Sequence, residues 1–318
     1  MNWNKLITAI TLAVCAGSAG AANSLDLANY YVAGNYAIDT LNDMGLEASA
    51  VTYARDRNSL FVVGDEGLGV IELSLTGQTL GTMAFDWAGT GSSNNDAEGL
   101  TYLGNGQLVV VDERPQIAYK FDYTSGGTVA LNNQAKVAIT GSTTNVGNVG
   151  TEGISIDPRD GSFYSVKQDN SAVLRKSTLT FATGFGTATT TDLFTGSASL
   201  FGLNSLSDVQ TLSPIDSLTG TAAADNLLIL SLDSKKLVEL NPFSGLVISS
   251  FDLASLTAQA IEGVTVDYLG NIYLVAEDSG TPNSRLFVLA PTAVPLPGAA
   301  WLFGSALAGL VAARRKHA

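Results

Sequence analysis

The sequence predicts an all-β protein with the fold of a five-bladed β-propeller. The 318 residues include 33 Gly and only 14% charged residues, a composition that favours strands and turns over a coiled coil or a helical bundle. One short pattern occurs five times, beginning at Ser49, Glu98, Glu152, Asp208 and Glu262, so successive copies start 49, 54, 56 and 54 residues apart. A period near 50 residues with strand-like content is typical of propeller blades.

Each copy of the pattern is predicted to begin a four-stranded blade. In the second repeat the first strand covers Glu98–Tyr102, and an apolar second strand covers Leu108–Val111 after a Gly-Asn-Gly turn. The third strand, Ile117–Tyr123, alternates apolar and polar residues, as a half-buried strand does. The predicted outer strands are Thr79–Asp86, Val129–Ile139, Leu246–Asp252 and, with less clear limits, Phe181–Phe194.

The fifth repeat has no outer strand of its own, because it runs into the C-terminal segment after Val288. The strand-like run Tyr30–Asp39 is predicted to supply it and to close the ring. Closure removes the open sheet edges that would otherwise invite aggregation. Residues 23–291 therefore form one propeller domain. The alternative is a sixth blade, which would have to lie within the Gly- and Ser-rich stretch Thr183–Ser205.

Residues 1–22 have the features of a secretory signal peptide. Lys5 is a short basic region, Leu6–Ala16 is apolar, and Ala19-Gly20-Ala21 offers small residues for cleavage. This order of features predicts export through the inner membrane.

Residues 292–318 are predicted to anchor the exported chain in the membrane. Gly298–Ala313 is a run of 16 residues without a charge, followed at once by Arg314, Arg315 and Lys316. As a helix this run would measure about 24 Å, which approaches the thickness of the hydrocarbon core once its flanks are included. The basic cluster is expected to stay on the cytoplasmic side.

This tail resembles the PEP-CTERM class of bacterial sorting signals, in the variant that begins Val-Pro-Leu-Pro. The residues that carry the resemblance are Val294, Pro295, Leu296, Pro297, Arg314 and Arg315. Gly298 stands where that variant usually has Ala. The resemblance implies a Gram-negative host, processing by an exosortase-type membrane protease, and delivery to the cell surface or the medium.

The composition excludes several classes of chemistry. The only His is His317 and the only Cys is Cys15, so the body of the chain cannot build a Ser-His-Asp triad or a Cys/His zinc site. The formal charge of −13 argues against binding to nucleic acid. Any chemistry must use carboxylates, hydroxyls, Lys or a hard metal ion, and no catalytic residue is assigned.

Four carboxylates are predicted to meet at one mouth of the central channel. The first strand of each blade lines the channel, and the first pattern position is occupied by Glu98, Glu152, Asp208 and Glu262. The second strands run back antiparallel, so their ends reach the same face. The further candidates at those ends are Asp65, Asp112, Glu113, Lys167 and Glu277.

Converging carboxylates cannot all stay ionised without compensation. They can bind a hard cation such as Ca²⁺, which takes six to eight oxygen ligands. They can share protons and act as general acid and base. They can also hydrogen-bond the backbone of the next blade, where the Gly that follows Glu permits close approach. These three interpretations remain open from the residues alone.

Three segments of the chain resemble the SdiA-regulated, YjiK-like family of exported propellers. They are Asp96–Arg114, Gly150–Ile156 and Ile261–Glu277. The motifs most specific to the family are Glu-Gly and Asp-Glu-Arg. The resemblance covers roughly Ala28 to Pro291. It implies an extracytoplasmic propeller with a divalent cation and no established reaction.

The expected function is that of a non-enzymatic binding or scaffold module at the cell envelope. Its expected partner is an extracellular polysaccharide or an envelope protein. The alternative is a hydrolase that acts on glycosides or phosphate esters through paired carboxylates or calcium. An inverting glycosidase needs its two carboxyl groups about 6.5–9.5 Å apart. The sequence alone does not give the distance between any two carboxyl groups.

Overall fold

The computed structural model describes residues 24–38, 43–92, 95–168, 172–194, 196–278 and 283–292. The predicted signal peptide and the predicted sorting tail from residue 293 onward lie outside the described residues. Within the described residues, no helix is both long enough and apolar enough to span a bilayer.

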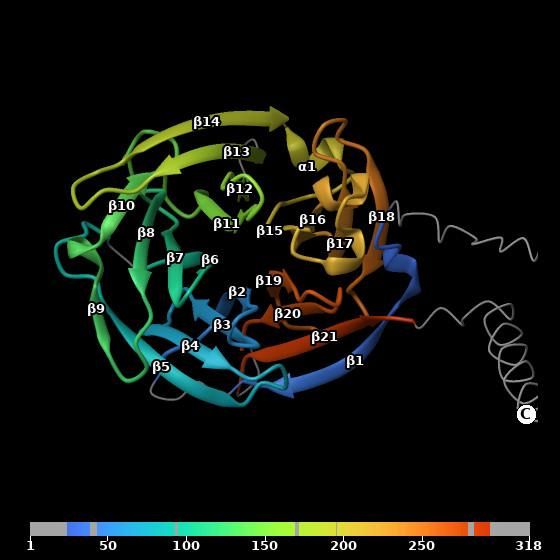
Figure 1. The fold of residues 1–318 in the computed structure, drawn as a ribbon, viewed down its shortest axis with the longest axis horizontal. Coiled ribbons are helices and arrows are strands. Elements are labelled where there is room, and N and C mark those ends of the chain that lie inside the picture. The colour runs from blue at the N-terminus through green and yellow to red at the C-terminus, as the bar shows by residue number, and fades with distance from the viewer. Residues whose placement is uncertain are drawn as a thin grey trace, which may run out of the picture.

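The described strands form five sheets that stand around a common axis (Figure 1), so the prediction of a five-bladed propeller is confirmed. Blade 1 contains β2 (Ala48–Ala54), β3 (Ser59–Gly64), β4 (Gly69–Leu73) and β5 (Thr79–Asp86). Blade 2 contains β6 (Ala97–Gly104), β7 (Gln107–Asp112), β8 (Ile117–Asp122) and β10 (Ala135–Ala138). Blade 3 contains β11 (Thr151–Ile156), β12 (Phe163–Lys167), β13 (Val173–Thr180) and β14 (Thr187–Phe194).

Blade 4 contains β15 (Asp208–Thr211), β16 (Leu227–Ser231), β17 (Lys236–Leu240) and β18 (Val247–Asp252). Blade 5 contains β19 (Ile261–Val266), β20 (Ile272–Ala276), β21 (Arg285–Pro291) and β1 (Tyr30–Ala37). The inner strands β2, β6, β11, β15 and β19 surround the axis, as Figure 1 shows.

The N-terminal strand closes the ring. β1 pairs antiparallel with β21, with Tyr30 opposite Pro291 and Ala37 opposite Arg285. Figure 1 shows the two strands side by side at the outer edge of blade 5. The predicted closure is therefore confirmed. Strands from the two ends of the domain thus pair with each other, so β21 has a partner on both sides and β1 becomes the outer strand of blade 5.

Two details differ from the sequence prediction. The segment expected as one outer strand, Val129–Ile139, divides into two: β9 (Thr128–Ala130) pairs parallel with β5 of blade 1, and only β10 belongs to blade 2. Val129 is 6% exposed and packs with Phe85 in the apolar layer between these blades, which explains why the segment crosses over. The six-bladed alternative is wrong, because Thr183–Ser205 holds β14 and the short helix α1 (Ser197–Leu200).

The apolar core lies between neighbouring blades. Each sheet is covered on both faces, so its middle strands are apolar on both sides: every residue of β3 and of β20 is buried. Between blades 1 and 2, Phe61 packs against Tyr102 and Tyr123 at ring-centroid distances of 5.7 and 4.7 Å. Fully covered sheets explain the unbroken apolar second strands in the sequence.

Candidate metal centre

In four blades, a β-bulge interrupts the inner strand near its start. The register with the second strand skips one residue in β2, β6, β11 and β19. The skipped residues are Ser49, Glu98, Glu152 and Glu262. A bulge leaves one residue out of the ladder and redirects its side chain. The repeated pattern therefore marks a local backbone irregularity, and three of the four bulge residues are glutamates.

The glycine after each of these glutamates allows the next blade to approach closely. A Cβ at Gly99 would lie 3.0 Å from the carbonyl oxygen of Glu152, and one at Gly263 would lie 2.9 Å from the carbonyl oxygen of Ser49. Real Cβ atoms would force the backbones apart at these distances. The Glu-Gly pair thus places a carboxylate at the bulge while keeping adjacent inner strands in contact.

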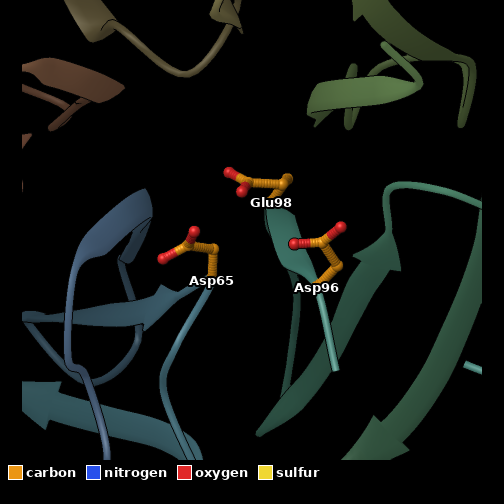
Figure 2. A group of neighbouring side chains, drawn as sticks. All are labelled: Asp65, Asp96 and Glu98. Carbon is orange, nitrogen blue, oxygen red and sulfur yellow. The ribbon is translucent and has the colours of Figure 1, made fainter. Parts of the chain in front are cut away.

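Three carboxylates from blades 1 and 2 lie close enough together to share an ion. Asp65 follows β3, Asp96 precedes β6, and Glu98 is the bulge residue of β6. One oxygen from each lies within 4.8 Å of the others. Figure 2 shows their three side chains gathered in one space between the two blades. Oxygen atoms this close on acidic side chains suit a shared cation.

Contacts around this group hold it in place but leave oxygens unused. In blade 1 the hydroxyl of Ser49 accepts a hydrogen bond from the Asp65 backbone N–H at 3.3 Å and donates one to the Glu47 carbonyl at 2.9 Å. Arg114 Nε lies 2.5 Å from Asp96 Oδ2. Asp65 Oδ1 is buried and has no hydrogen-bond partner among the described residues. The described contacts therefore pair one of the three carboxylates, Asp96, with a positive charge.

Two further carboxyl pairs interact with this group: Glu113 with Glu152, and Glu262 with Glu277. In blade 2, Glu113 is 1% exposed; its Oε1 accepts from the Gly150 N–H at 2.8 Å, while its buried Oε2 has no partner among the described residues. Burial, followed by the charge of Glu113, raises the pKa of Glu152 well above its usual value. Burial and the charge of Glu277 raise the pKa of Glu262 to about 9.

The pKa values show that these groups act on one another. Burial raises the pKa of Glu98 well above its usual value, and the charges of Glu152, Glu262 and Asp65 add to that effect. Burial also raises the pKa of Asp65 to about 6, with a contribution from Glu277. The interacting carboxyls include Glu47, Asp65, Asp96, Glu98, Glu113, Glu152, Glu262 and Glu277. We call these eight residues the acidic cluster.

Asp208, predicted as a fourth member, has different contacts. No bulge precedes it, and it pairs regularly with Leu230. Its Oδ1 accepts from the Val209 N–H and its Oδ2 from the Val264 N–H, both at 2.7 Å. The carboxylate is 4% exposed and joins the inner strands of blades 4 and 5. Its geometry matches the interpretation in which an acidic residue bonds the neighbouring blade.

The remaining predicted residues lie at the ends of second strands. Asp112 is fully buried at the end of β7, and burial raises its pKa to about 7. Glu113 and Glu277 belong to the acidic cluster. Lys167 is half-buried at the end of β12.

Sequence reasoning did not single out Glu47 and Asp96. Each lies two residues before a bulge position, at Ser49 and Glu98. This shared spacing in blades 1 and 2 is the signal that could have found them. The equivalent positions in blades 3 and 5 are Gly150 and Ala260, so a comparison of the repeats does not reveal it.

Comparison with known proteins identifies a family but no ligand. The family model described as SdiA-regulated matches residues 23–287. Similar solved structures include regucalcin, a calcium-binding protein from Agrobacterium tumefaciens, at 12% identity, covering 77% of this chain and 71% of that one, with a TM-score of 0.43. A luciferin-regenerating enzyme has 10% identity, covers 80% and 94%, and has a TM-score of 0.47.

A third solved structure is the β-propeller domain of Cps50 (Swd1) from Myceliophteria thermophila. It has 13% identity and a TM-score of 0.37, and the match covers 77% of this chain. The chain spans less than two thirds of that domain's length, at 65%. Resemblances at this distance do not indicate what the chain binds.

Proposed function

This chain belongs to the SdiA-regulated family, and we propose that it is an exported binding or scaffold module that holds a divalent cation in the acidic cluster. The observation that carries the proposal is the approach of Asp65, Asp96 and Glu98, whose oxygens lie within 4.8 Å of one another. An all-oxygen set of donors suits a hard cation, and Ca²⁺ fits best because it accepts irregular coordination by carboxylates.

The unused oxygens support the same assignment. Asp65 Oδ1 and Glu113 Oε2 are buried without hydrogen-bond partners among the described residues, and an unsatisfied buried acceptor is costly. A bound cation would supply the missing positive charge, with Asp65, Asp96 and Glu98 as ligands. The charges of Glu152 and Glu262 raise the pKa of Glu98. These two glutamates would add negative charge around the bound cation.

The cation would stabilise the axis of the propeller. Asp65 belongs to blade 1 and Asp96 and Glu98 belong to blade 2. Coordination would therefore add a link between two blades that already meet through apolar packing and the Thr52–Tyr102 hydrogen bond. The exposed side of the site could then receive a negatively charged or hydroxyl-rich group of a partner. We propose an extracellular polysaccharide or an envelope protein as that partner.

Export and sorting are part of this proposal and are supported by the sequence alone. The signal peptide of residues 1–22 would direct export through the inner membrane. The tail from Val294 to Arg315 would anchor the chain by its membrane helix until an exosortase-type protease processes it. The propeller would then act at the cell surface or in the medium.

Hydrolysis by the same carboxyls has weaker support. The oxygens of Asp65, Asp96 and Glu98 lie closer together than the roughly 6.5–9.5 Å that an inverting glycosidase keeps between its carboxyl groups to admit a water. Carboxylates at such short range favour a shared cation or a shared proton.

Calcium binding is tested by thermal unfolding of residues 23–291 with and without Ca²⁺. At a hundredfold excess over Kd, binding adds about 2.7 kcal/mol, which corresponds to a Tm increase of about 5–10 °C for a domain of this size. The double variant Glu98→Gln with Glu262→Gln should lose this increase. The matched control Asp122→Asn, which changes an exposed carboxylate at the end of β8, should keep it.

Three outcomes would contradict the proposal. Wild-type protein whose Tm does not respond to Ca²⁺ or other divalent cations would leave the acidic cluster without a metal role. A Ca²⁺ response retained in full by the double variant would place the ion elsewhere. Turnover of a glycoside or phosphate ester that the double variant abolishes would favour the hydrolase instead.

A further inference from the structure

A ring of hydroxyl groups lies at the channel mouth opposite the acidic cluster. The fourth position of each repeat carries a hydroxyl, and the residues are Thr52, Thr101, Ser155, Thr211 and Thr265. Thr52 Oγ1 accepts from the Tyr102 N–H of the next blade at 3.1 Å. Thr265 Oγ1 accepts from the Tyr53 N–H at 3.1 Å and so connects blade 5 to blade 1. These bonds fix the ends of the inner strands.

A cavity of about 750 Å³ opens at this mouth. Its volume falls within the range of about 300–1,000 Å³ that is usual for small-molecule sites. Its walls come from every blade and include Tyr53, Tyr102 and Tyr268. Tyrosine offers a large apolar face for stacking and a polar edge. The cavity is separate from the acidic cluster, since no member of the cluster is among its lining residues.

One wall of the cavity is built by an insertion that breaks the symmetry of the blades. The first and second strands are joined by Arg55–Asn58 in blade 1 but by Leu212–Asn226 in blade 4. This longer connection contains two short 3-10 helices and contributes Pro214, Asp216 and Thr219 to the lining. Its apolar residues are buried in the core cluster of blades 4 and 5. A well-anchored extra loop on a rigid scaffold is typical of a binding site.

The cation at the cavity, Arg55, is already paired with Asp216, and the third charged residue of the lining, Asp56, accepts a backbone hydrogen bond. Arg55 donates to both carboxylate oxygens of Asp216, at 2.8 and 2.9 Å, and its guanidinium lies 4.9 Å from the centre of the Tyr268 ring. Asp56 Oδ2 accepts from the Asn105 N–H at 3.0 Å. An anionic ligand would need a cation that is not already neutralised. The lining therefore suits a neutral molecule that stacks and forms many hydrogen bonds.

We propose that this cavity binds a neutral carbohydrate unit. Tyr268, whose ring lies under the Arg55 guanidinium, provides aromatic contact, the Arg55–Asp216 pair provides donors and acceptors for hydroxyl groups, and the insertion of blade 4 limits the shape of the sugar. This site lies at the mouth opposite the proposed cation, so it goes beyond the proposed function and does not depend on it.

The test is titration calorimetry of residues 23–291 with tetrasaccharide probes of three kinds. The neutral probes are cellotetraose, laminaritetraose and maltotetraose; the anionic probe is tetragalacturonate and the cationic probe is chitosan tetramer.

We expect a neutral probe to bind most tightly. Tyr268→Ala should weaken that binding at least about tenfold, a change of about 1.4 kcal/mol. Arg55→Ala, at an exposed side chain, should weaken it too and provides a second variant if Tyr268→Ala does not fold.

The control Tyr31→Ala removes a tyrosine that is 53% exposed on the outer strand β1 and should leave sugar affinity unchanged. The Glu98→Gln, Glu262→Gln variant and a chelator should also leave it unchanged, which separates this site from the cation site. The proposal is overturned if no neutral probe binds, if tetragalacturonate or chitosan binds best, or if both cavity variants bind like the wild type. Loss of sugar binding on chelation would assign the sugar to the acidic mouth instead.

Discussion

Metal-free protein should lose stability steadily as the pH rises from about 5 to 9. Burial and neighbouring charges raise the folded-state pKa of Asp65 to about 6, of Glu47 and Glu113 to about 7, and of Glu262 to about 9. The unfolded chain releases these protons near pH 4–4.5. The folded state therefore holds more protons over this range, and its stability falls as the pH rises through each folded pKa.

Each unit of pKa shift is worth about 1.4 kcal/mol before solvent screening. The carboxyls titrate together, so the total loss of stability should be smaller than the sum of their separate shifts. Saturating Ca²⁺ should flatten the decline, because the ion binds the deprotonated carboxylates and its affinity grows with pH. Urea unfolding at pH 5 to 9, with a chelator and with Ca²⁺, measures both effects. The Glu98→Gln, Glu262→Gln variant should show a shallower decline without metal. Metal-free stability that stays level or increases over this range would disprove the account of the cluster.

Asp208→Ala should destabilise the propeller by about 2–5 kcal/mol, whether or not Ca²⁺ is present. The substitution leaves the buried N–H groups of Val209 and Val264 without their acceptor, and each such loss costs about 1–3 kcal/mol. Asp208→Asn should cost less, since its amide oxygen still accepts one of the two hydrogen bonds. Urea unfolding of both variants, with Asp122→Ala as an exposed control, measures the difference.

The role of Asp208 is separated from that of the glutamates by its response to calcium. A folded Asp208→Asn variant should keep the Tm increase caused by Ca²⁺, while the Glu98→Gln, Glu262→Gln variant should lose it. An Asp208→Asn variant with wild-type stability and no Ca²⁺ response would make Asp208 a ligand, as the repeat pattern alone predicts, and would contradict the structural role assigned to its carboxylate.

The ring and its closure could be predicted because they depend on features repeated along the chain. Each blade has one copy of the pattern and an apolar second strand, and the missing outer strand of blade 5 has one evident substitute in Tyr30–Ala37. The crossing of β9 to blade 1 could not be predicted, because a parallel pairing with β5 depends on the packing of Val129 between blades.

The acidic cluster could be predicted in part for the same reason. Glu98, Glu152 and Glu262 share a repeat position, so the propeller axis brings them together. The divergence of Asp208 follows from a bulge that its strand lacks, and a bulge depends on the register between two strands. The sequence does not show this difference: Val209 stands where Gly follows each of the three glutamates, but the bulged strand of blade 1 has Ala50 at the same position.

Anomalous diffraction from crystals grown with Ca²⁺ tests the central claim most directly. We expect one strong peak bounded by Asp65, Asp96 and Glu98, about 2.3–2.6 Å from their carboxylate oxygens, and no such peak in the Glu98→Gln, Glu262→Gln variant. An empty site at saturating Ca²⁺, or a peak found only away from these three residues, would contradict the claim that the bulged inner strands build a cation site.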